Sequence, residues 1–187
     1  LIKQPENLKA GYIIVTGIFL SHFIAKAGLF WISGLTDKRN FKDWKGLKKH
    51  SVLFFLFGIF IMSLSGLPPF PGFWAKWELV KHLFASQMGG WVWLILLGSL
   101  LEAVYLLRWF INSFQSGKIR IKTDLIKNTV IALFGLITIF MSYYTAGLVS
   151  GMEKIYFLPV MAGLALVLLD FLSARVKRFL LLLGLSG

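Results

Sequence analysis

Apolar residues gather in blocks long enough to cross a membrane, and short polar segments separate these blocks. The pattern predicts helices over 11–34, 91–115, 128–149 and 155–174. Each block holds roughly 20 residues, the length that an α-helix needs to cross about 30 Å of hydrocarbon. A fifth block, at 51–88, is interrupted. Together the five blocks predict an all-α fold: a polytopic transmembrane helical bundle of about five crossings. We expect residues 1–187 to form a single transmembrane domain.

The apolar block between residues 51 and 88 is interrupted near its middle. Three prolines and two glycines break the helix pattern over 66–72, between predicted half-helices at 51–65 and 73–88. Each half, about 23 Å long at 1.5 Å per residue, is too short to span a bilayer comfortably. We therefore predict one discontinuous crossing, with two separate crossings as the alternative. Since lipid offers no partner to freed backbone groups, such breaks lie against protein or a hydrated cavity.

The distribution of basic residues favours one broken crossing over two. The chain has 20 Lys and Arg against 8 Asp and Glu, a net charge of +12. Six of the basic residues lie in 35–50 and five in 108–127. A single broken crossing places both loops on one side of the membrane, and the positive-inside rule predicts that loops 35–50 and 116–127 face the cytoplasm or an equivalent side. Because this charge lies in loops between apolar blocks, nucleic-acid binding is not expected.

Five of the ionisable residues inside the predicted spans are candidate site residues. His22 and Lys26 are four residues apart and share one face of the first helix, near the bilayer midplane, where a charged lysine costs at least about 2.5–3.5 kcal/mol. We expect these two side chains to be buried. Lys76 lies in the first turn after the break, Glu78 on another face of that turn, and Glu102 in the middle of the third span. Ionisable groups at this depth predict a functional site, and this line of groups suits proton transfer.

Structural roles remain open for these residues. Lys26 can be held in one permanent ion pair. Glu102 can be the counter-ion of Lys76 or Lys26, or it can pair with Arg108. A direct pair between Lys76 and Glu78 is not expected, because residues two apart do not face each other on a helix.

The sequence lacks the motifs of chemistry on an organic substrate. It has no cysteine and no phosphate-binding loop, nucleophile motif or zinc-binding motif. His22, His50 and His82 are too scattered to suggest a metal site, so we expect no cofactor in this chain. Asp170 is expected in an ion pair at the membrane surface, and Lys81 with His82 is a candidate exit path for protons.

Two segments resemble motifs of a known family. Residues 21–30, Ser-His-Phe-Ile-Ala-Lys-Ala-Gly-Leu-Phe, resemble the H-x-x-x-K-A-x-L-F segment of the antiporter-like membrane subunits. Residues 65–76, Ser-Gly-Leu-Pro-Pro-Phe-Pro-Gly-Phe-Trp-Ala-Lys, resemble the G-(I/L)-P-P-x-x-G-F-x-x-K broken-helix segment of the same family. Such subunits occur in respiratory complex I, in Mrp-type Na⁺/H⁺ antiporters and in energy-converting hydrogenases.

The resemblance implies proton translocation across an energy-coupling membrane. It implies that Lys76 carries a proton and that His22 and Lys26 belong to a hydrophilic axis at the membrane midplane. Glu78 and Glu102 lie outside the matching motifs, so the resemblance implies no role for them. Because members of the family are longer, the chain resembles the C-terminal part of such a subunit.

The resemblance also implies that other membrane subunits are partners. The redox chemistry of a quinone-reducing translocase would then lie in those partners and not in this chain. Two alternatives stay open: a structural membrane subunit whose ion pairs are locked, and a secondary transporter of Na⁺ or a small substrate that binds at the broken helix.

Overall fold

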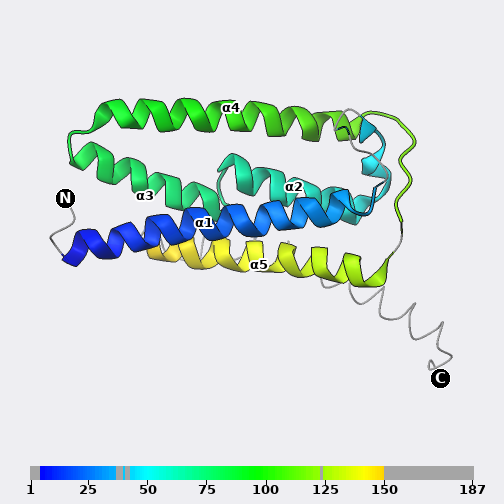
Figure 1. Ribbon diagram of the computed structural model, residues 1–187, viewed down its shortest axis with the longest axis horizontal. Coiled ribbons are helices and arrows are strands. Elements are labelled where there is room, and N and C mark those ends of the chain that lie inside the picture. The colour runs from blue at the N-terminus through cyan, green and yellow to red at the C-terminus, as the bar shows by residue number, and fades with distance from the viewer. Residues whose placement is uncertain (1–4, 37–39, 41–42, 123, 150–187) are drawn as a thin grey trace, which may run out of the picture.

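The protein is a bundle of helices that run along one long axis (Figure 1). The computed structural model describes residues 5–36, 40, 43–122 and 124–149. The α-helices are α1 (Pro5–Ser33), α2 (Ser51–Ser65), α3 (Pro71–Ala85), α4 (Gly89–Phe114) and α5 (Leu125–Val149), and a short 3-10 helix, η2, covers Leu47–Lys49. The described ranges contain no β-strand.

Three helices are long and apolar enough to cross a membrane, over Ala10–Ser33, Gly89–Phe114 and Leu125–Thr145. The shorter helix α2 is also apolar. The prediction of an all-α membrane bundle is therefore confirmed. The predicted crossing at 155–174 and the expected ion pair of Asp170 lie outside the described residues.

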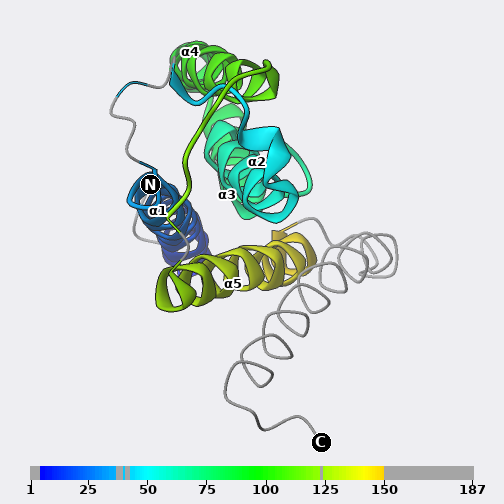
Figure 2. The same cartoon turned by 90° about the vertical axis from the view of Figure 1, so that its right-hand side faces the viewer.

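α2 and α3 lie end to end beside α1, so that the two short helices together run alongside that helix (Figures 1 and 2). α2 has the predicted bounds, and it ends at Gly66, whose φ of 68° is left-handed and favours glycine. α3 begins at Pro71, earlier than the predicted Phe73. Proline suits the first helical position, because its φ is already helical and the N–H it lacks would have no helical partner there. The break is thus shorter than predicted and covers residues 66–70.

α1 and α5 begin at least three residues earlier than the apolar pattern predicts. α1 begins at Pro5, a second proline at a helix start. α5 begins at Leu125, because the side chain of Asp124 caps it: Asp124 Oδ1 accepts the N–H of Ile126 at 3.0 Å. In both helices, polar residues extend the helix on the N-terminal side of the apolar block, which lies where it was predicted.

The two basic loops meet at the same end of the bundle, at the right of Figure 1, which we call the basic end. The N–H of Lys122 donates to the carbonyl of Leu35 at 2.9 Å, and Thr36 and Ile121 form an isolated antiparallel bridge. Gly46, with φ of 91°, lies directly against the backbone of Gly117, so a Cβ there would clash. These contacts bring the described parts of loops 35–50 and 116–127 together at one end of the bundle.

α2 lies at the centre of the bundle and α4 lies at its surface. α2 packs against α1, α4 and α5, and ten of its fifteen residues are buried. Phe60 of α2 fits against α1 because Gly28 has no side chain at the contact. α4 exposes a long apolar face that includes Trp93, Leu97 and Leu101, as a helix in contact with lipid would.

Candidate functional site

The break between α2 and α3 is stabilised by hydrogen bonds from three directions. The N–H of Leu67 reaches back to the carbonyl of Met62 at 3.1 Å. The carbonyl of Pro69 accepts a hydrogen bond from Trp74 Nε1 at 3.2 Å and another from the hydroxyl of Ser142 on α5. Because lipid cannot replace such partners, α5 is part of what makes a broken helix possible here.

Lys76 extends from α3 across the break towards α4. Its Nζ lies 3.2 Å from Glu102 Oε2, and the two side chains are 18% and 31% exposed. A Cβ on Gly66 would lie 3.2 Å from Lys76 Cδ and 3.3 Å from Nζ. Gly66 therefore both ends α2 and leaves the space in which the lysine side chain lies. We refer to this contact as the Lys76–Glu102 pair.

Glu78 belongs to a separate group on α3, the Glu78 cluster, which consists of Glu78, Lys81 and His82. Lys81 Nζ lies 2.6 Å from Glu78 Oε2, and His82 Nε2 lies 3.3 Å from Glu78 Oε1. These partners are three and four residues from Glu78 on the same helix, the spacing at which side chains meet. Lys76 pairs with Glu102, one of the partners that the sequence left open. It does not pair with Glu78, as the spacing of two residues predicted.

His22 and Lys26 lie on α1, and their surroundings differ. His22 is half-buried, and the charges of Glu102, Lys76 and Lys26 all act on it. The side chain of Lys26 is exposed, because α1 and α4 lie well apart (Figure 2) and no described helix covers this position. Its predicted burial at the membrane midplane stays a prediction.

Lys26 borders a cavity of about 390 Å³ that opens between α1, α2 and α4. Its other lining residues are Leu29, Phe30, Ser33, Leu64, Leu106 and Trp109. Trp109 Nε1 is buried and has no hydrogen-bond partner in the described part of the chain. Lys26 likewise forms no ion pair with any described residue.

Two serines beside the break were not among the residues predicted from the sequence. Ser142 donates to the break from α5. Ser63 is 1% exposed, and its hydroxyl has no hydrogen-bond partner in the described ranges. Both are polar residues within apolar runs, which is the signal that could have identified them.

The structure also bears on the expected partner of Arg108 and on a metal site. Arg108 is exposed and forms no ion pair with Glu102, whose partner is Lys76. Within the described ranges, no three metal-ligating side chains lie close enough together to hold a metal ion. The prediction that the chain binds no cofactor stays a prediction.

Comparison with known proteins points to one family. Residues 7–105, which contain all five candidate residues, match the family described as "NADH:quinone oxidoreductase/Mrp antiporter, TM". The chain is 39% identical over 107 residues to the NADH-quinone oxidoreductase subunit N of Desulforudis audaxviator, which covers 52% of this chain and 21% of that protein. It is 36% identical over 102 residues to a subunit of the Na(+)/H(+) antiporter of Bacillus subtilis, with 51% and 21% covered.

A longer match extends further along the chain. The NADH-quinone oxidoreductase subunit N 1 of Chloroherpeton thalassium is 27% identical over 160 residues, which cover 80% of this chain and 33% of that protein. The chain thus spans a third or less of the length of these relatives. The family match covers more than half of the chain, and the chain belongs to the family of NADH:quinone oxidoreductase and Mrp antiporter transmembrane proteins.

Proposed function

We propose that this chain is part of a proton-translocating membrane subunit and that the Lys76–Glu102 pair is where a proton is held and released. The observation that carries the proposal is an ion pair of 3.2 Å between two helices, directly beside a helix break. Neither side chain is fully buried, and the proposal requires that water reaches both. Lys76 follows the break, where the family resemblance implies a proton carrier.

The proposed step depends on the distance between the two charges. While they are together, the ammonium of Lys76 and the carboxylate of Glu102 stabilise each other. If α3 and α4 move apart, each charge loses its counter-ion in surroundings where an unpaired charge is costly. Lys76 then releases its proton and becomes a neutral amine, and it takes up a proton again when Glu102 returns.

We propose that the proton passes between Lys76 and α1 through His22. His22 lies within electrostatic range of Lys76, Glu102 and Lys26, which supports its choice as the intermediate group. Lys26 would continue the path from the exposed side of α1. On the other side, the Glu78 cluster would connect the site to the end of α3, since Lys81 and His82 are 44% and 40% exposed.

The proposal includes a membrane orientation and partners. The basic end would face the cytoplasm or an equivalent compartment, in agreement with the positive-inside rule. The relatives are named as subunits, which supports assembly of this chain with other membrane subunits. Exposed Lys26, inside an apolar span, is where we expect a partner to pack.

A structural role is the second candidate, because the same ion pair could be permanent. In that case the Lys76–Glu102 pair would hold α3 against α4, and its loss would reduce assembly instead of transport. A secondary transporter of Na⁺ or a small substrate would require a ligand at the break, and no observation favours it over the proton pathway.

Replacement of Lys76 by alanine tests the proposal in the full-length protein within its complex. We expect proton translocation into inverted membrane vesicles, followed with a pH-sensitive dye, to fall at least about tenfold. The amount of assembled complex, measured on native gels, should stay unchanged. Lys118→Ala is the matched control, since Lys118 is exposed at the basic end.

Each alternative predicts a different result for the Lys76 variant. Loss of assembled complex would favour the structural role. Translocation at the normal rate in an assembled complex would refute the proposed role of Lys76.

A further inference from the structure

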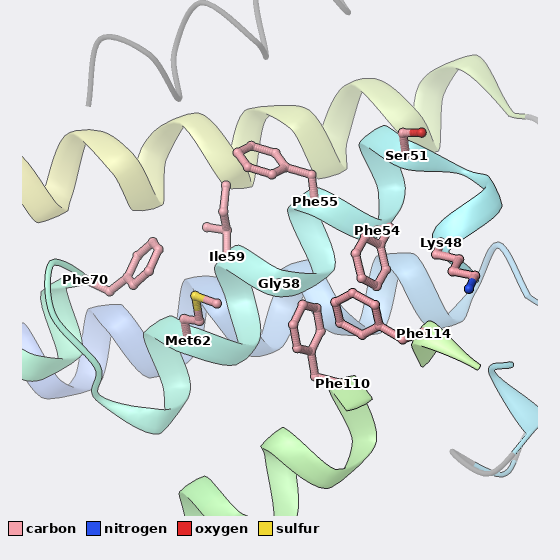
Figure 3. Close-up of a pocket in the computed structure, with 10 residues that line it drawn as sticks. All are labelled: Lys48, Ser51, Phe54, Phe55, Gly58, Ile59, Met62, Phe70, Phe110 and Phe114. Carbon is pink, nitrogen blue, oxygen red and sulfur yellow. The ribbon is translucent and has the colours of Figure 1, made fainter. Parts of the chain in front are cut away.

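A groove runs along the face of α2 that is turned away from α1 (Figure 3). Its volume is about 410 Å³. The lining residues are Lys48, Ser51, Phe54, Phe55, Gly58, Ile59, Met62, Phe70, Phe110 and Phe114. α2 provides its length, and two phenylalanines from α4 provide one wall (Figure 3). It is separate from the Lys76–Glu102 pair, whose residues do not line it.

The length and position of the groove match one leaflet of a bilayer. Between Ser51 and Met62 the helix rises about 16 Å at 1.5 Å per residue, and half of the hydrocarbon core is about 15 Å thick. The groove begins at the basic end and reaches Phe70 in the break. It therefore leads from the membrane surface to the middle of the crossing.

The polar groups of the groove are concentrated at its outer end. Lys48 and Ser51 are both exposed and lie at the basic end, while every deeper lining residue is apolar or glycine (Figure 3). α2 begins at Ser51, and the side chain of His50 does not cap it. The positive end of the dipole of α2 therefore also lies at the outer end of the groove. A ligand that fits this distribution has an anionic group at one end and an apolar chain behind it.

We propose that this groove binds an anionic phospholipid, with one acyl chain along α2 and the phosphate at Lys48. Basic residues at the membrane surface attract anionic lipids, and basic pockets between transmembrane helices bind their head groups. The proposal does not rest on proton translocation, because it uses neither the Lys76–Glu102 pair nor the Glu78 cluster.

Photo-crosslinking of the full-length protein in membranes tests the proposal. The probes are phosphatidylglycerol and phosphatidylcholine that carry the same diazirine group in one acyl chain, and mass spectrometry maps the labelled peptides. We expect the phosphatidylglycerol probe to label 51–62 and 110–114, and unlabelled phosphatidylglycerol to compete with it. Lys48→Gln should lower this labelling about fivefold.

Two further variants separate the head group from the chain. Lys49→Gln is the matched control, because Lys49 is next to Lys48 in η2 but does not line the groove; its labelling should change by less than about twofold. Met62→Trp should fill the deep end and remove labelling there. Equal labelling by phosphatidylcholine, equal effects of the two lysines, or crosslinks to a neighbouring protein in place of lipid would each overturn the proposal.

Discussion

The Lys76–Glu102 pair and the Glu78 cluster begin two residues apart on α3, yet they are built differently. The Glu78 cluster lies within one helix, at spacings of three and four residues. The Lys76–Glu102 pair joins α3 to α4 across 26 positions of sequence. A pair within one helix persists whenever that helix forms. A pair between helices depends on how the helices are placed, so only the Lys76–Glu102 pair can couple a change of charge to a movement.

The two groups also differ in how exposed their basic side chains are. Lys76 lies against Gly66 in the break and is 18% exposed. In the Glu78 cluster the glutamate is also 18% exposed, but its partners Lys81 and His82 are 44% and 40% exposed. Pairs near water contribute little, about 0–1 kcal/mol, because water screens them. Removal of one partner from a less exposed pair is more damaging, since the remaining charge has no counter-ion. Substitutions at matched positions can measure this difference.

The largest difference is expected between the two glutamates. Glu102→Gln removes the counter-ion of Lys76 and should lower proton translocation by the complex at least about tenfold. Glu78→Gln weakens contacts that are mainly local and should lower it by less than about threefold. Both variants should assemble normally on native gels. Equal losses for both variants would show that the Glu78 cluster is as essential to the path as the Lys76–Glu102 pair, so that the two groups do not differ in function.

A smaller effect is expected at the glycine that makes room for Lys76. Gly66→Ala puts a side chain at φ of 68° and within 3.2 Å of Lys76 Cδ, which should lower the free energy of unfolding by about 1–2 kcal/mol. Gly98→Ala is the control: Gly98 lies in α4 with no neighbour within 4 Å, and alanine there should stabilise the helix by about 0.5–1 kcal/mol. Thermal unfolding in detergent measures both changes. Equal stability of the two variants would argue against the role assigned to Gly66.

The smallest effect is expected at the hydrogen bond from α5 to the break. Ser142→Ala removes one of two donors to the Pro69 carbonyl, and Trp74 remains. The free energy of unfolding in bicelles should fall by about 0.6 kcal/mol, the average for hydrogen bonds between membrane helices. Thr145→Ala is the control, because among the described residues Thr145 bonds only to carbonyls of its own helix. An effect no larger than that of Thr145→Ala would mean that the break needs no support from α5.

Much of the fold could be predicted from the order of the residues. Blocks of apolar residues determine helices of membrane-spanning length, and the helix that ends at Ser65 has the predicted bounds. Charge counting also predicted that both basic loops lie at one end, because a broken crossing changes the side of every later loop. The start of α3 was predicted less well, since a proline expected within the break begins the helix instead.

The tertiary structure decided which charges meet. The sequence placed Lys76 after the break and Glu102 in the middle of a span, and it left Lys76, Lys26 and Arg108 as possible partners of Glu102. Contacts within a helix follow from spacing alone, so the separation of Lys76 from Glu78 could be predicted. Contacts between helices depend on rotation and packing, which no local pattern specifies. For that reason the Lys76–Glu102 pair, the exposure of Lys26 and the support of the break by Ser142 emerge only once the helices are packed together.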